Sequence, residues 1–211
     1  MIRLATFFTL LAIIGCDEQS PQIALVDVTH RTGPIFVTTS GSTPPRSIVE
    51  VNGPGVCLFD ADGDGDIDLF IANGATVDDP ENGPGSRLFR NTLRETGTLT
   101  FVDMTEDAGI ELRRWATSAT AVDLTGDDEV DLYVTCIGPD VLLRNDGHGH
   151  FTDITAAAGI DVPGWSTCAA PGDIDCDGDL DLYIARYIDW DFSSPPPPTV
   201  TFRGEQVIAG P

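Results

Sequence analysis

The sequence predicts an all-β fold built from repeated units of four short antiparallel strands. An aspartate-rich loop occurs three times in the 211 residues, and each copy runs directly into a short stretch of aromatic and branched apolar residues. The second and third copies belong to a longer unit that repeats after 50 residues, as the positions of Phe101 and Phe151 show. Short apolar stretches bounded by acidic loops are typical of strands joined by turns.

The acidic loops comprise residues 60–68, 123–131 and 173–181, and we call them loop 1, loop 2 and loop 3. Oxygen-bearing side chains recur at positions 1, 3, 5 and 9 of each loop. Carboxylates so close together repel by about 4 kcal/mol per pair at an effective dielectric constant of about 20. A bound cation would remove this repulsion, so the pattern predicts a metal site in each loop.

The expected ion is Ca²⁺, because it accepts six to eight oxygens at about 2.3–2.6 Å in flexible geometry, whereas Mg²⁺ keeps waters and near-octahedral order. Positions 1, 3, 5 and 9 are expected to supply side-chain oxygens, and position 7 its backbone carbonyl. The candidate ligands are Asp60, Asp62, Asp64, Asp66 and Asp68 in loop 1, Asp123, Thr125, Asp127, Glu129 and Asp131 in loop 2, and Asp173, Asp175, Asp177, Asp179 and Asp181 in loop 3.

Loop 2 is expected to be the weakest of the three sites. Thr125 replaces a carboxylate with a neutral hydroxyl, and Asp128 stands at the bend where the other loops have Gly65 and Gly178. Glycine adopts a left-handed backbone at little steric cost, whereas other residues are strained there.

The loops differ from the helix-loop-helix calcium site, which needs a bidentate glutamate at position 12. Position 12 is Ile71, Val134 or Ile184, each inside an apolar stretch. We therefore expect the metal at a strand-loop-strand hairpin. Asp and Gly are also ordinary turn residues, so acidic turns without metal are the alternative; three copies with ligand spacing favour the metal.

Two further motifs complete the repeat. The pattern apolar-x-Asp-x-Thr-x-x-x-Gly occupies residues 25–33, 101–109 and 151–159. Its last two copies each begin 22 residues before the next acidic loop. The pattern Leu-x-Arg-Asn occupies residues 88–91 and 142–145, and Asp146-Gly147, a hairpin-turn signal, follows the second copy. Four strands in about 50 residues is the size of a β-propeller blade.

These motifs together resemble the FG-GAP/VCBS repeat proteins, which are integrin-alpha-like propellers. More narrowly, the chain is similar to the N-terminal part of ASPIC/UnbV-domain and cartilage acidic protein-like proteins. The resemblance implies calcium in the loop that joins two strands of a blade. It is carried by residues 55–69, 87–91, 145–155, 165–167 and 202–204, with 210–211.

The repeats in this chain make about two and a half blades of a propeller for which the resemblance implies about seven. After loop 3 the chain passes through four prolines, Pro195 to Pro198, and reaches no further Leu-x-Arg-Asn. We expect residues 25–211 to be propeller repeats truncated at the C-terminus. Further C-terminal blades or another chain would then supply the missing strands, because open sheet edges are normally covered.

The N-terminus predicts export. Residues 1–15 read as a lipoprotein signal peptide, cleaved before Cys16, whose thiol would carry the lipid, and residues 16–24 read as a linker. The apolar stretch 4–14 is too short to span a membrane as an ordinary helix. An ordinary secretory signal or a core strand is the alternative. The predicted location is the periplasmic or cell-surface side of a bacterial membrane, attached only through the lipid, and which membrane holds the anchor stays open.

The composition is strongly acidic, with a formal net charge of −23 and no lysine. Proteins that bind nucleic acid carry a basic surface, so the composition argues against nucleic acid as a partner. The same charge opposes compaction by self-repulsion, and bound calcium would reduce it.

Besides Cys16 the chain has four cysteines, at 57, 136, 168 and 176. Export allows disulfides, and four thiols allow three pairings, among which Cys168 with Cys176 would tie loop 3 to the strand before it. The alternative is that Cys57 and Cys136 are buried thiols in strands.

No catalytic residues can be assembled from the sequence. His148 and His150 fall in the expected turn after Asn145, and Trp115 and Trp165 are expected to pack between blades. The interpretation is a non-enzymatic, calcium-binding exported repeat protein that serves as a binding or adhesion module for an unknown protein or polysaccharide at the cell surface. The alternatives are a non-catalytic propeller scaffold of a secreted enzyme or polysaccharide-processing system, and a purely structural spacer.

Overall fold

The computed structural model describes residues 26–33, 36–160, 162–194 and 199–208. The predicted signal peptide, the lipid-bearing Cys16 and the linker to residue 24 lie outside the described residues. None of the helices in these ranges has the length and apolar character needed to cross a membrane.

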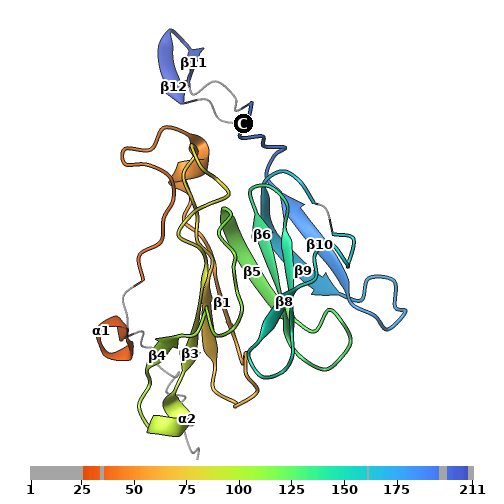
Figure 1. The fold of residues 1–211 in the computed structure, drawn as a ribbon. Helices are drawn as coiled ribbons and strands as arrows, with labels where there is room; N and C mark the ends of the chain where they lie inside the picture. Colours follow the sequence, from red (N-terminus) through yellow and green to blue (C-terminus); the bar gives the residue numbers. More distant parts are fainter. Residues whose placement is uncertain (1–25, 34–35, 161, 195–198, 209–211) are drawn as a thin grey trace, which may run out of the picture.

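The first blade is an antiparallel sheet of four strands in the order β1-β2-β3-β4 (Figure 1). Its strands are β1 (Val56–Phe59), β2 (Asp68–Ile71), β3 (Arg87–Asn91) and β4 (Phe101–Asp103). The second blade repeats the order as β5-β6-β7-β8. Its strands are β5 (Ala116–Val122), β6 (Asp131–Cys136), β7 (Val141–Asn145) and β8 (Phe151–Asp153). The all-β fold of four-stranded blades is thus confirmed.

The third sheet contains two strands within the described residues, β9 (Ser166–Gly172) and β10 (Asp181–Arg186). The remaining strands, β11 (Thr199–Phe202) and β12 (Glu205–Ile208), form a separate hairpin. Its two-residue turn is Arg203-Gly204, where φ is 52° and 85°, as a type I′ hairpin turn requires. The sequence analysis did not anticipate this hairpin.

The helical segments are short: α1 (Thr29–Thr32), the 3₁₀ turn η1 (Ile48–Val51) and α2 (Leu93–Thr96). Helix α1 falls in the first copy of the apolar-x-Asp-x-Thr motif, whose later copies form β4 and β8. Those later copies pair with the preceding strands β3 and β7. The described part of the first copy, residues 26–33, forms α1 and no strand.

Neighbouring blades share a continuous apolar core. Phe59, Phe70 and Leu88 of the first blade pack with Leu132 and Phe151 of the second. Polar contacts between the first strands of neighbouring sheets add to it, since the hydroxyls of Thr117 and Thr120 on β5 donate to the carbonyls of Ser166 and Ala169 on β9. The repeats therefore stack side by side, and burial in one sheet depends on the next.

The predicted packing of Trp115 and Trp165 is confirmed. Both are buried in one aromatic cluster with Trp190, in which the rings of Trp165 and Trp190 have centroids 6.0 Å apart. The cysteines at 57, 136, 168 and 176 are all unpaired thiols. Cys136 is buried as one alternative expected, whereas Cys57, for which the same was expected, is only half-buried. The suggested Cys168–Cys176 disulfide is not formed in this structure.

Candidate metal centres in the blade hairpins

Each acidic loop joins the first two strands of its sheet. The last ladder pairs are Phe59 with Asp68, Val122 with Asp131, and Gly172 with Asp181. Position 9 therefore lies opposite the residue just before position 1, and the ladder brings both ends of the loop together. The strand-loop-strand hairpin expected for all three loops is confirmed.

The carboxylate at position 1 folds the loop around itself by accepting backbone hydrogen bonds. Asp60 accepts from the N–H groups of Gly63 and Gly65, both at 2.9 Å. Asp123 accepts from Gly126 and Asp128 at 2.7 and 2.9 Å. Asp173 does the same in loop 3, where Gly178 donates at 3.1 Å. These bonds turn the loop backbone inward and hold the later carboxylates near position 1.

Two left-handed residues make this bend possible. The expected one, at position 6, has φ of 85° at Gly65, 70° at Asp128 and 98° at Gly178, so the strain predicted at Asp128 lies where expected. The sequence analysis missed a second one at position 4, which is glycine in loops 1 and 2 but Cys176 in loop 3, with φ of 62°. Loops 2 and 3 thus each place one non-glycine residue in a strained conformation.

Position 9 is tied to the third strand in the complete blades. Asp68 accepts from Ala61 N–H within the loop and from Asn91 N–H at the end of β3, both at 2.8 Å. Asp131 accepts likewise from Leu124 and from Asn145 at the end of β7, both at 3.0 Å. Both carboxylates are completely buried.

The asparagine of the Leu-x-Arg-Asn motif holds the loop a second time through its side chain. The Asn91 amide donates to the Ile67 carbonyl, and the Asn145 amide donates to the Val130 carbonyl, each at 3.1 Å. Asn145 also donates to the Ala61 carbonyl of loop 1 at 2.9 Å, which links the second blade to the first metal loop. Sequence reasoning used this motif only as a strand signal, although its repeated order with the loops could have indicated this role.

The carboxylates gather as predicted in two of the three loops. Side-chain oxygens of Asp60, Asp62 and Asp68 lie within 4.8 Å of one another, as do those of Asp173, Asp175 and Asp181. Because Thr125 stands at position 3, loop 2 assembles no such group of three carboxylates within the described residues. Loop 1 also has a second group that the sequence analysis missed, in which Asp64 and Asp66 meet Glu95 of α2.

The electrostatics of loop 1 favour a cation. Burial raises the pKa of Asp68 from 3.8 to about 6, against the opposing hydrogen bonds from Asn91 and Ala61, and the charges of Asp62 and Asp64 add to the rise. Burial also raises the pKa of Asp62. The Oδ2 atom of Asp64 is buried without a hydrogen-bond donor. A buried carboxylate oxygen without a donor, beside three clustered carboxylates, fits an oxygen-binding cation such as Ca²⁺.

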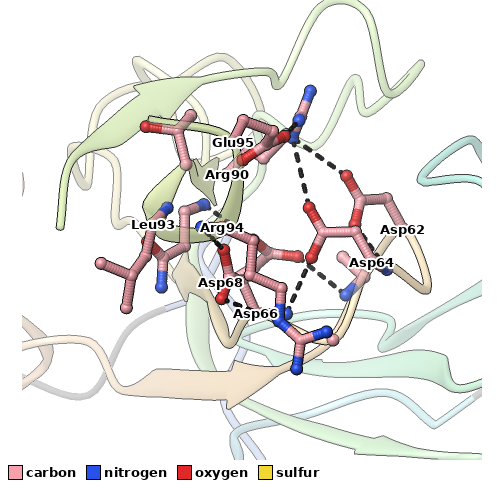
Figure 2. Close-up of polar contacts among 12 residues, drawn as sticks. Asp62, Asp64, Asp66, Asp68, Arg90, Leu93, Arg94 and Glu95 are labelled. Atoms are coloured by element: carbon pink, nitrogen blue, oxygen red, sulfur yellow. Dashed lines mark hydrogen bonds and ion pairs between the residues drawn. The ribbon is translucent and has the colours of Figure 1, made fainter. Parts of the chain in front are cut away.

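Arginines from the third strands and from α2 lie beside the loops, as Figure 2 shows for Arg90 and Arg94 at loop 1. Arg90 places Nε 3.0 Å from Asp62 Oδ2 and also contacts Glu95. Arg94 places Nε 3.5 Å from Asp66 Oδ1 and donates its backbone N–H to Asp66 Oδ2. In the second blade Arg144 donates to Asp127 Oδ2 at 2.8 Å from Nη2 and 3.1 Å from Nε, and this contact lowers the pKa of Asp127. Loop 3 has no third strand in the described residues and so no counterpart of these arginines.

The histidines of the β7–β8 turn flank Gly149, where an added Cβ would lie 3.1 Å from Asp62 Cβ of loop 1, but neither histidine belongs to the carboxylate groups above. His148 and His150 are exposed, and His150 Nδ1 lies 2.9 Å from the carbonyl of Asp107.

Comparison with known families agrees with this geometry. The model of the FG-GAP-like repeat matches residues 60–134 and 130–184, which together make up more than half of the chain. These matches span all three acidic loops and end inside β10. No curated protein matches the chain. On this match and on its four-stranded blades, the chain belongs to the FG-GAP-like repeat family.

Proposed function

We propose that this protein is a calcium-binding propeller module. The observation that carries the proposal is the carboxylate group of Asp60, Asp62 and Asp68 beside the buried, donor-free Oδ2 of Asp64. Loop 3 offers an equivalent group, whereas loop 2 has the hydroxyl of Thr125 in place of a carboxylate at position 3. The ion would supply positive charge at the centre of each hairpin, and the loop residues would supply its oxygens.

Calcium at these positions would stabilise the fold. The loop carboxylates repel one another, and the chain as a whole carries −23. A site at a calcium concentration of about one hundred times its Kd adds about 2.7 kcal/mol to the free energy of unfolding. Because each loop joins the first two strands of a sheet, ordering it also fixes the adjoining edge of the blade.

The wider role we propose is non-enzymatic binding or adhesion at a bacterial cell surface, with a protein or polysaccharide as partner. The N-terminal lipoprotein motif and the acidic, lysine-free composition support it. Replacing Cys16 with Ser should release the protein from the membrane fraction. Continued retention of this variant would count against the lipid anchor.

The calcium assignment is tested with substitutions at position 5. Asp64→Ala combined with Asp177→Ala should reduce the calcium content, measured by equilibrium dialysis and atomic spectroscopy, by two ions per chain. It should also lower the Tm measured with calcium. The matched control is Asp78→Ala, which removes an exposed carboxylate that pairs with Arg46 outside the loops. An unchanged calcium content in the double variant would refute the assignment.

A further inference from the structure

Arg90 reaches from β3 across the mouth of loop 1. Its Nε lies 3.0 Å from Asp62 Oδ2 and 3.9 Å from Asp64 Oδ2, which belong to positions 3 and 5 of the loop. These contacts are ion pairs without directed hydrogen bonds, because both Arg90 Nε and Asp64 Oδ2 are buried and lack a hydrogen-bond partner. A charge held by proximity alone can be exchanged for another at little cost in hydrogen bonding.

Arg90 has a second carboxylate partner outside the loop. Its Nη2 contacts Glu95 Oε1 in helix α2 (Figure 2). That helix belongs to residues 92–100 between β3 and β4, and the matching connection between β7 and β8 is the shorter turn 146–150. The first blade therefore carries an insertion that presents a carboxylate to Arg90 beside the loop.

Resting on the proposed calcium site, we propose that Arg90 is the counter-ion of Asp62 and Asp64 in the calcium-free protein and leaves them when a divalent cation binds to loop 1. A guanidinium and a divalent cation beside the same two carboxylates repel each other strongly at this range. Glu95 keeps the displaced guanidinium paired. Arg90 thus weakens calcium binding while it stabilises the empty loop.

The second blade lacks this arrangement. Arg144, at the position of Arg90, makes two directed hydrogen bonds to the single carboxylate of Asp127. Its side chain is more exposed, 53% against 38% for Arg90. Exchange with a cation is therefore a property of loop 1 and its α2 insertion.

The experiment uses the chain from residue 16 onward. It measures the calcium affinity by calorimetry and the Tm in the presence of chelator. Arg90→Ala should bind calcium at loop 1 about tenfold more tightly, and its Tm in chelator should fall. Glu95→Gln should weaken binding at loop 1 when Arg90 is present, because the displaced guanidinium loses its partner. It should leave binding unchanged in the Arg90→Ala background, which separates this effect from the loss of a carboxylate near Asp64 and Asp66. The matched control is Arg87→Ala, on the same strand, which pairs with Asp103 and contacts no loop carboxylate; its calcium affinity should equal that of the wild type.

The opposite signs of the two readouts separate this role from a structural one. A lower Tm in chelator with unchanged calcium affinity in Arg90→Ala would overturn the exchange, and so would weaker calcium binding. If Arg90→Ala does not fold in chelator, Arg90→Gln takes its place with the same expected results. The rate of calcium release is then also compared between the wild type and Glu95→Gln, and equal rates contradict the proposal. Absence of calcium binding in the wild type would overturn the proposed function itself, whereas binding at an unchanged affinity overturns only the exchange.

Discussion

Loop 1 and loop 3 have carboxylates at the same positions but lie in different surroundings. In loop 1, Asp68 is completely buried and is fixed by Asn91 of β3. In loop 3, Asp181 accepts from Ile174 N–H inside its own loop, and the described sheet ends at β10. The loop sequence therefore sets which ligands gather, and the following strand sets how deeply they are buried.

The same contrast appears two residues after position 9 of each loop, in the strand that follows the loop. Phe70, Tyr133 and Tyr183 occupy equivalent positions, and their exposed fractions are 0%, 0% and 68%. Phe70 packs in the core shared with the second blade, and Tyr133 packs with Ala169, Leu182 and Ile184 of the third sheet. Tyr183 has no following blade in the described residues. The same position in the repeat is therefore buried where another sheet follows and exposed where none is described.

The largest expected difference is between the two tyrosines. Tyr133→Ala should lower the free energy of unfolding by about 3–5 kcal/mol, because it empties a packed site. Tyr183→Ala should change it by less than about 0.5 kcal/mol. Urea unfolding in calcium measures both. Tyr133→Phe is the matched control, since it removes only the hydroxyl that donates to Asp140 at 2.9 Å. Equal losses for the two alanine variants would contradict the burial contrast.

The next effect tests the third-strand asparagines. Asn145→Ala should destabilise by about 2–3 kcal/mol, because its buried side chain donates to Ala61 and Val130 and accepts from Gly147. It should also weaken calcium binding at loops 1 and 2 but not at loop 3. The control is Asn82→Ala. The exposed Asn82 amide donates to Asp79 at the surface, so this substitution should have a small effect. Weakened calcium binding at loop 3 would contradict the prediction that Asn145 acts only on the loops that it contacts.

A smaller effect concerns pH in chelator. Burial raises the pKa of Asp68 to about 6, above its unfolded value of 3.8, so the folded state binds the proton more tightly. The contribution of Asp68 therefore lowers stability as pH rises from about 4 to about 6, and is constant above that range. Asp68→Asn cannot ionise, so the difference between its pH profile and that of the wild type should show this fall. Parallel profiles would mean that Asp68 is not buried as a charge.

The smallest effects concern backbone strain at position 6. Asp128→Gly should stabilise the calcium-free protein by about 0.5–1 kcal/mol, because glycine tolerates the φ of 70°. Gly178→Ala should destabilise by a similar amount, since its φ is 98° and an added Cβ would meet no atom within 4 Å. Thermal unfolding in chelator measures both. Changes of the same sign would indicate that backbone strain is not the cause.

Much of the fold could be predicted from short-range patterns. The four strands of each blade, the loop boundaries and the left-handed bend at position 6 follow from apolar runs, turn residues and repeated spacing. The described part of the motif at residues 25–33 forms helix α1 and no strand, although the later copies of the motif form strands that pair with β3 and β7. The β11–β12 hairpin was missed because it lies outside the repeat.

The site was predicted less completely than the fold. The carboxylate groups of loops 1 and 3 follow from spacing within nine residues. Asn91, Asn145, Arg90 and Glu95 reach the loops from other strands or from α2, at distances in sequence that no local pattern encodes. Their positions depend on strand pairing and on the packing of one blade against the next.

The most direct test of the central claim is the calcium content of the folded wild-type chain at saturating calcium. The account predicts close to three ions per chain, with the last to bind in loop 2, and a large fall of the Tm when chelator removes them. A folded chain that binds no calcium and melts at the same temperature in chelator would contradict it, and would leave the three loops as acidic turns.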